Sequence, residues 1–163
     1  MLRISKMTDY ATLILAELRD SSTLASASEL AGRTGLGLAT VSKVLKTLAR
    51  ADLVTAQRGS NGGYQLTTSA DTISAAAIID AIEGPVAITE CATDDIACEL
   101  ESTCNLGGAW QKINTAIRAA LTDVSLEDLC TGTNIPDTFP LLPLAAIKPG
   151  VRNASALRRA SKL

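Results

Sequence analysis

The sequence predicts a mainly α-helical fold with one small β-hairpin and a long additional helix. Three observations carry this prediction. Apolar residues recur at helical spacing in several segments, two short β-like runs enclose a glycine-rich tip, and one long apolar stripe lies in the last third of the chain. The chain has 163 residues, 47% of them apolar and only 2% aromatic, so its core is expected to be built from Leu, Ile, Val and Ala.

The first two predicted helices precede a glycine turn. The first begins at Thr8-Asp9 and ends near Asp20, and its apolar residues recur at helical spacing. The second runs from Ser26 to Arg33. Ser26 is placed to cap its N-terminus, and Glu29, three residues later, completes a capping box.

A third helix is predicted from about Leu38 to Ala51, after the turn at Thr34-Gly35. Its inner face carries four apolar residues: Val41, Val44, Leu45 and Leu48. The order helix, glycine turn, helix is typical of a helix-turn-helix, whose second helix enters the major groove of DNA.

A hairpin is predicted directly after this third helix. Its strands are residues 53–56 and 64–67, and the Asn61-Gly62 pair between them is a strong turn signal. Because the tip also carries Arg58, this hairpin matches the wing of a winged helix-turn-helix.

The remaining helices are expected in the second half of the chain. Asp71 is placed to cap a helix that ends at Gly84-Pro85, and Ser125 to cap a short helix ending at Cys130. Between them, a helix from about Asn105 to Thr122 bears one apolar stripe: Leu106, Trp110, Ile113, Ile117 and Leu121. Such a stripe needs a partner surface, and a second copy of the chain is the economical one.

The chain is therefore divided into four parts. These are a winged helix-turn-helix (1–84), a cysteine-bearing loop (85–104), a dimerisation helix with a short helix (105–131) and a flexible basic tail (132–163). Residues 1–70 carry eight Lys/Arg against five Asp/Glu, whereas residues 71–130 carry two against eleven. A DNA-contacting face is therefore expected in the first seventy residues, despite the net charge of -2.

Six residues are candidates for contact with double-stranded DNA. On the third helix, Thr40 and Ser42 are placed to reach base edges, and Lys43 to read guanine or hold a phosphate. Phosphate contacts are expected from Lys46 and Arg50, and the wing residue Arg58 is placed to enter a minor groove.

Three cysteines, Cys91, Cys98 and Cys104, lie close together among Thr, Asp, Glu, Asn and Gly residues. Their spacing matches neither the paired knuckles of structural zinc nor the ferredoxin run. From spacing alone they are candidates to hold zinc, bind an iron–sulfur cluster or sense oxidants. Cys130, on an apolar helix, suits a buried hydrophobic role.

An enzyme is not expected. The chain contains no histidine, which excludes the usual Cys–His activation, and the glycines of the hairpin lack the Lys-Ser/Thr of a phosphate-binding loop. No apolar run suggests a signal peptide or a membrane span, so a cytoplasmic protein with reduced thiols is expected.

The sequence resembles the IscR/NsrR-type winged-helix iron–sulfur regulators, and among them the branch that controls the SUF cluster-assembly operon. The resemblance rests on the three cysteines, Trp110 and motifs at residues 6–11, 30–31, 34–36, 40–46, 58–64 and 82–85. It implies a homodimer with one cluster per subunit, held by Cys91, Cys98 and Cys104, with [2Fe–2S] favoured over [4Fe–4S]. It also implies that the state of the cluster changes the affinity for DNA.

The residue expected as the fourth cluster ligand differs from that in some members of this family. Some relatives use a histidine where this chain has Gly107, and others use a carboxylate of the partner subunit near the start of the first helix. Asp9 occupies that position, although a helix N-terminus also favours an acidic residue there. Cys130 and Glu101 are further candidates.

The leading functional hypothesis is a cluster-responsive transcriptional repressor of iron–sulfur assembly genes. The alternative is a repressor of the same fold that senses nitric oxide or thiol oxidation. A structural zinc protein would instead bind about one zinc per chain.

Overall fold

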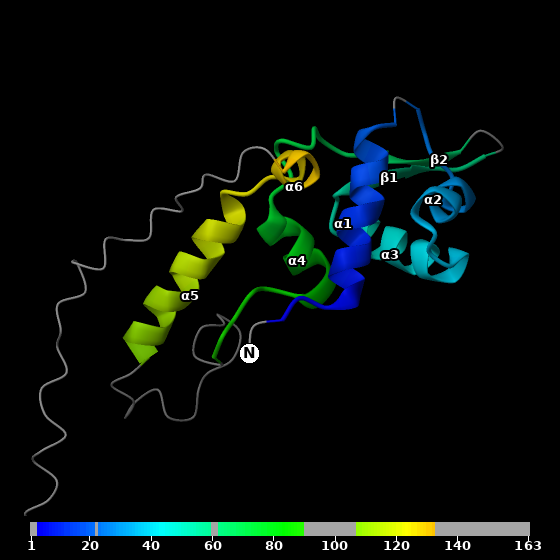
Figure 1. Cartoon of the computed structure of the whole chain (residues 1–163). Coiled ribbons are helices and arrows are strands. Elements are labelled where there is room, and N and C mark those ends of the chain that lie inside the picture. Colours follow the sequence, from blue (N-terminus) through cyan, green and yellow to red (C-terminus); the bar gives the residue numbers. More distant parts are fainter. Residues whose placement is uncertain (1–2, 22, 60–61, 90–106, 133–163) are drawn as a thin grey trace, which may run out of the picture.

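The fold is mainly helical, with a two-stranded antiparallel hairpin after the third helix (Figure 1). The structure, a computed structural model, describes residues 3–21, 23–59, 62–89 and 107–132. Its elements are α1 (Lys6–Arg19), α2 (Ala27–Thr34), α3 (Leu38–Arg50), β1 (Val54–Gln57), β2 (Gly63–Leu66), α4 (Ala75–Glu83), α5 (Gly107–Thr122) and α6 (Leu126–Thr131). The predicted fold class is confirmed.

Helix α1 begins earlier than the predicted start at Thr8-Asp9. Ser5 has an extended backbone and its hydroxyl accepts the Thr8 N–H at 3.4 Å, so Ser5 is the N-cap. Thr8 is buried inside the first turn, while Asp9 remains exposed beside it. The helix ends at the predicted place, with Asp20 as its C-cap.

The capping box of α2 is confirmed. The Glu29 N–H donates to the Ser26 hydroxyl at 3.2 Å, and the Ser26 N–H donates to the Glu29 carboxylate at 2.7 Å. The backbone and then the side-chain hydrogen bond from Ser26 lower the pKa of Glu29. Gly35 ends the helix in the left-handed conformation, with φ of 71°. This turn sets α3 at an angle to α2, as a helix-turn-helix requires.

The hydrophobic core lies between α1, α3 and α4. The predicted inner face of α3 is fully buried and packs against Ile14 and Leu15 of α1 and Ile78 of α4. Leu126 of α6 is also fully buried in this cluster, although it lies beyond α5 in sequence. The core of the helix-turn-helix therefore includes a residue from the far end of the described chain.

The hairpin is anchored to the helical part through a third short segment. Strand register pairs Val54 with Leu66 and Gln57 with Gly63. The Ala25 N–H donates to the Tyr64 carbonyl at 3.0 Å, and the Tyr64 N–H donates back at 2.8 Å. Gly63 lies so close to this segment that an added Cβ would come within 2.8 Å of the Ala25 carbonyl oxygen. A side chain at position 63 would push the hairpin away from the helices. Helices α1 to α4 and the hairpin together form the head of the molecule.

Helix α4 is capped by Ser74 and not, as predicted, by Asp71. The Ala77 N–H donates to the Ser74 hydroxyl at 3.1 Å, whereas Asp71 is exposed in a turn before the helix. Ile73 lies outside the helix but is buried, because the turn directs it into the core. Gly84, with φ of 88°, ends the helix as predicted.

Helix α5 lies outside the core, separated from α1–α3 by α4 (Figure 1). The Arg118 guanidinium pairs with the Asp80 carboxylate of α4 at 2.5 and 3.3 Å. A backbone clip follows α5: the Ala75 N–H donates to the Val124 carbonyl at 2.8 Å, and the Leu126 N–H to the Ile73 carbonyl at 2.7 Å. None of the helices within the described ranges is long and apolar enough to cross a bilayer.

Candidate nucleic-acid interface and cysteine segment

The solvent-facing side of α3 is basic. Lys43, Lys46 and Arg50 are exposed on the side opposite the buried face, and Thr40 and Ser42 are half-buried beside them. In the part of the chain that the structure describes, ion pairs involve Arg19 and Arg118 but none of these three basic residues. Their charges are therefore available to an anionic partner.

The N-terminus of α3 carries no side-chain cap. Gly37 is the N-cap, and its carbonyl accepts the N–H groups of Thr40 and Val41 at 2.9 and 3.0 Å. The first N–H groups of a helix have no partner within the helix. The helix therefore begins with polar backbone groups open to solvent.

The wing presents Arg58 next to a tight glycine turn. Arg58 is exposed directly after β1, and Gly59 has a φ of 126°. At Gly62 an added Cβ would lie 2.3 Å from the Gln57 carbonyl oxygen. The backbone therefore closes tightly beside Arg58, while Ser60 and Asn61 at the tip lie outside the described residues.

The predicted cysteine ligands Cys91, Cys98 and Cys104, and also Glu101, lie outside the described residues. Within the described ranges, no three His, Cys, Asp or Glu side chains come together to hold a metal ion. The two flanks of the cysteine segment are described. They are residues 84–89, which follow α4, and the start of α5 at Gly107.

Asn114 anchors the first flank and was not singled out from the sequence. It is only 8% exposed on a helix whose neighbouring positions are largely open, and its side-chain oxygen accepts the Ile88 N–H at 3.3 Å. The sequence signal was a lone amide in the middle of an apolar stripe. This contact ties the chain just before Cys91 to the centre of α5.

Glu83 anchors the same flank on its other side. Its carboxylate accepts the Thr8 hydroxyl and, at 2.9 Å, the Ser5 N–H. The Thr8 hydroxyl contributes most, and the Ser5 N–H next, to lowering the pKa of Glu83. The first turn of α1 and the end of α4 are thus joined at the residue before Gly84.

This contact predicts a pH dependence of stability. A carboxyl whose folded pKa is lowered stabilises the fold above its unfolded pKa, near 4.3, and loses that contribution as pH falls through the folded value. Glu83→Gln should therefore lower the urea midpoint more at about pH 7 than at about pH 3.5. An equal loss at both values would contradict a role for the charged carboxylate.

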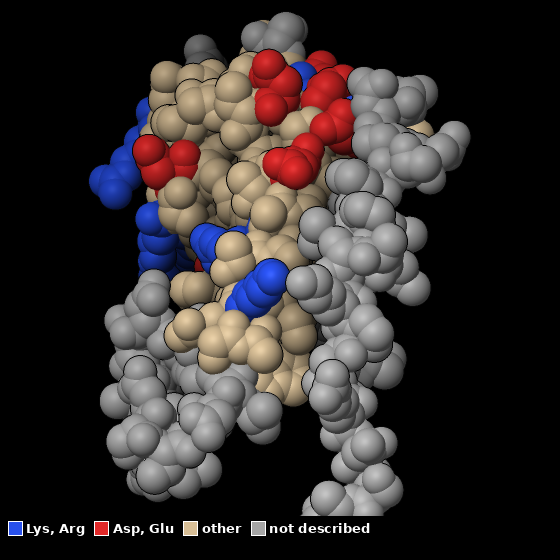
Figure 2. Space-filling model, turned by 90° about the vertical axis from the view of Figure 1, so that its left-hand side faces the viewer, with Lys and Arg blue, Asp and Glu red and all other residues tan. Residues whose placement is uncertain are grey.

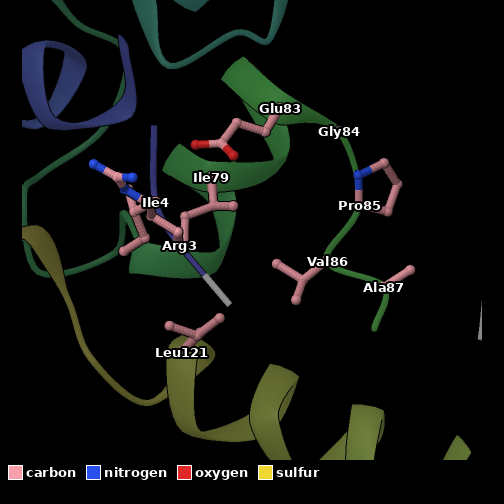
Figure 3. A pocket seen from close by; sticks show the side chains of 9 residues that line it. All are labelled: Arg3, Ile4, Ile79, Glu83, Gly84, Pro85, Val86, Ala87 and Leu121. Carbon is pink, nitrogen blue, oxygen red and sulfur yellow. The ribbon is translucent and has the colours of Figure 1, made fainter. Parts of the chain in front are cut away.

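Two hollows meet at the junction of α1, α4 and α5. The first, about 320 Å³, lies between the chain start, the end of α4 and residues 84–87. Figure 3 shows Ile79, Val86 and Leu121 facing this space, with Glu83 at its edge. The second is an apolar groove of about 390 Å³ between α1, α4, α5 and α6.

Asp9, the candidate fourth ligand, lines the second groove among apolar residues such as Ile78 and Leu121. Its approach to the cysteines is not tested, since these lie outside the described residues. Cys130 is half-buried on α6, against the core. Sixteen residues of α5 separate it from the cysteine segment, roughly 24 Å of helix.

Helix-turn-helix, basic outer helix face and basic hairpin together define the class of winged helix-turn-helix DNA-binding proteins. The chain belongs to the Rrf2 family, described as iron-dependent transcriptional regulators, whose model matches residues 4–132. The predicted class of function, a transcriptional regulator, is therefore confirmed. The family consists of regulators and not of enzymes.

Known relatives agree with this assignment. A protein of Azotobacter vinelandii, named as a helix-turn-helix-type transcriptional regulator, is 32% identical over 116 residues, which are 71% of this chain and 70% of that protein. The structure is similar to that of CymR, the global cysteine regulator of B. subtilis. Identity is 29%, coverage is 82% of this chain and all of the other, and the TM-score is 0.64.

The fold is also that of T. potens IscR, with a TM-score of 0.59, 22% identity, and coverage of 84% of this chain and 92% of the other. The family of the predicted resemblance is therefore confirmed at the level of Rrf2 regulators. The SUF branch is a finer assignment, which the likeness to CymR does not favour over its alternatives.

Proposed function

We propose that this regulator binds a palindromic operator as a homodimer and responds to an iron–sulfur cluster held by Cys91, Cys98 and Cys104. The cysteine trio between α4 and α5 carries the proposal, because three thiols among polar residues are ligand candidates rather than core residues. The regulated genes would be those of iron–sulfur cluster assembly, with repression as the expected sign.

Operator contact is proposed for the exposed face of α3 and for the wing. Thr40 and Ser42 would meet base edges, Lys43 a guanine or a phosphate, and Lys46 and Arg50 phosphates. Arg58 would enter the adjacent minor groove. The absence of ion pairs at the four basic side chains, among the described residues, supports this proposal.

The salt dependence of operator binding tests this face. Replacing one phosphate-contacting lysine should reduce the slope of log K against log salt by about 0.9, so Lys46→Ala should give a shallower slope. Lys112→Ala is the matched control, because Lys112 is an equally exposed lysine on α5, away from the head. Equal salt slopes for Lys46→Ala and Lys112→Ala would show that Lys46 does not contact a phosphate.

Dimerisation through α5 is supported by its exposed apolar side chains. Trp110 and Ile113 are both exposed on α5, and Leu129 is exposed at the edge of the apolar groove. Figure 2 shows an uncharged area on the α5 side, with acidic side chains mostly toward the top of the view and basic side chains at its left edge and centre. Exposed apolar area of this kind is typical of a protein interface.

The donor set fits an iron–sulfur cluster. The three thiols lie within residues 91–104, and hydrogen bonds of Glu83 and Ile88 join the flank before that segment to α1 and α5. A carboxylate from Asp9 of a second subunit is proposed as the fourth ligand. When bound, a cluster supplies labile Fe–S bonds that join the three thiolates and respond to redox conditions.

The chain's own residues then connect this segment to the DNA-binding head. Asn114 holds Ile88 against α5, and Glu83 holds the end of α4 against the first turn of α1. A change in the order of the cysteine segment would therefore act on α1 and α5 together. Because two half-sites must match a fixed spacing, a small change in their relative angle alters operator affinity.

The proposal is tested by the absorption spectrum of anaerobically purified protein, with iron and acid-labile sulfide counted per chain. Visible charge-transfer bands with about two iron and two sulfide per chain are expected for [2Fe–2S]. About four of each would change only the cluster type. A colourless protein with zinc, or with no metal after reconstitution, would overturn the cluster mechanism.

A second candidate function is regulation by cysteine status, nitric oxide or thiol oxidation. The likeness to CymR, a cysteine regulator, favours it. In this case bare thiols would respond, and operator binding would change on oxidation and recover with a reductant in metal-free protein.

A further inference from the structure

Leu38, the first residue of α3, is half exposed although it belongs to the apolar face of its helix. Leu38, Val41, Leu45 and Leu48 follow one another at helical spacing. The last three are fully buried, whereas Leu38 is 50% exposed and is not among the residues that pack on the core. The first turn of α3 therefore projects past the end of the core.

The residues next to Leu38 have small and mostly apolar side chains. Gly37 before it has no side chain, Ala39 after it is exposed, and Thr40 adds a methyl group. Helical side chains lean toward the N-terminus, so Leu38 extends toward the open end of the helix. In a helix-turn-helix, that end of the second helix meets the base edges of the major groove.

We propose that Leu38 reads thymine in the operator, by packing against the 5-methyl group of the base in the major groove. The inference rests on the proposed operator contact by α3 and deepens it. The thymine methyl is the apolar feature that distinguishes base edges there, and small apolar side chains contact it. The exposed basic residues Lys43 and Lys46, further along the same helix, would fix the helix on the duplex.

A second copy of the chain is a less suitable partner for Leu38. The exposed apolar residues of α5 lie on the opposite side of the head from α3, with α4 and α1 between them (Figure 1). The exposed basic side chains further along α3, Lys43 and Lys46, also match a nucleic acid better than an apolar protein face. We therefore assign DNA as the partner that covers this surface.

The test compares thymine with uracil, which lacks only the methyl group. An operator is first selected from random duplexes with the full-length protein, and each of its thymines is then replaced singly by deoxyuridine. For the wild type, at least one replacement should weaken binding about fourfold, the factor that burial of one methyl group gives. For Leu38→Ala, the thymine-to-uracil affinity ratio at that position should fall to about 1.

Two further variants keep the test decisive. Leu38→Met preserves an apolar side chain and should retain most of the wild-type ratio. Leu13→Ala removes an equally large side chain, 41% exposed on α1, and should leave the ratio unchanged. Because each protein is compared with itself on two duplexes, a general loss of fold or dimer does not change the ratio.

The outcomes separate this inference from the proposed function. If no operator can be selected, both are overturned. An operator without any methyl-sensitive thymine, or a wild-type ratio in Leu38→Ala, overturns only the role of Leu38. A change of oligomeric mass in Leu38→Ala with the ratio intact would assign this residue to a protein interface instead.

Discussion

Leu126→Ala is expected to destabilise the whole DNA-binding head, although residue 126 lies far from it in sequence. The Leu126 side chain is fully buried in the core cluster shared by α1, α3 and α4. Removing a buried leucine side chain leaves a cavity and costs about 2–5 kcal/mol. That is a large share of the stability of a domain of this size.

The measurement is equilibrium unfolding in urea, followed by circular dichroism. The matched control is Leu129→Ala in the same helix, where the side chain is 41% exposed and the loss should stay below about 1 kcal/mol. Both variants are measured at several protein concentrations, because loss of a dimer contact shifts the midpoint with concentration. Equal losses in the two variants would contradict the placement of α6 in the core.

Cys98→Ala is expected to remove the iron–sulfur cluster while leaving the head folded. Cys98 lies between the other two candidate ligands in sequence, and the core cluster of the head is formed by residues before and after that segment, from α1, α3, α4 and α6. Iron and sulfide per chain should therefore fall well below the wild-type values, because even the loss of a supporting residue lowers metal affinity by about 10–100-fold. The far-ultraviolet circular dichroism should stay close to that of the wild type.

Cys130→Ala is the control for this variant. Cys130 is half-buried against the core and separated from the cysteine segment by the length of α5, so iron and sulfide should be unchanged. Loss of iron in Cys130→Ala would assign the fourth ligand to this thiol and not to Asp9. Unfolding of Cys98→Ala would indicate a structural metal.

Local sequence signals predicted most of the head, because each depends on neighbours in the chain. The Ser26–Glu29 capping box, the left-handed Gly35 and the inner face of α3 follow from spacing within one or two turns. The wrongly predicted cap of α4 shows where such signals compete. Both Asp71 and Ser74 are good N-caps, and the choice of Ser74 depends on the burial of Ile73 by the tertiary fold.

The residues that sequence reasoning missed make contacts across long separations. Glu83 forms hydrogen bonds with Ser5 and Thr8, which lie at the start of the chain. Asn114 forms one with Ile88, on the other side of the cysteine segment in sequence. No pattern within one helix reveals such a partner. From the sequence, Glu83 belongs only to a family motif at residues 82–85, and the structure adds its hydrogen bonds to Ser5 and Thr8.

The backbone clip between residues 73–75 and 124–126 has a consequence for how the protein is made. A ribosome produces the helix-turn-helix, the wing and the cysteine segment before it reaches Leu126, which closes the core. Until then, the nascent head lacks a fully buried side chain, and its native state is correspondingly less favoured. The cysteine segment thus leaves the ribosome before Leu126, the side chain that completes the core of the head.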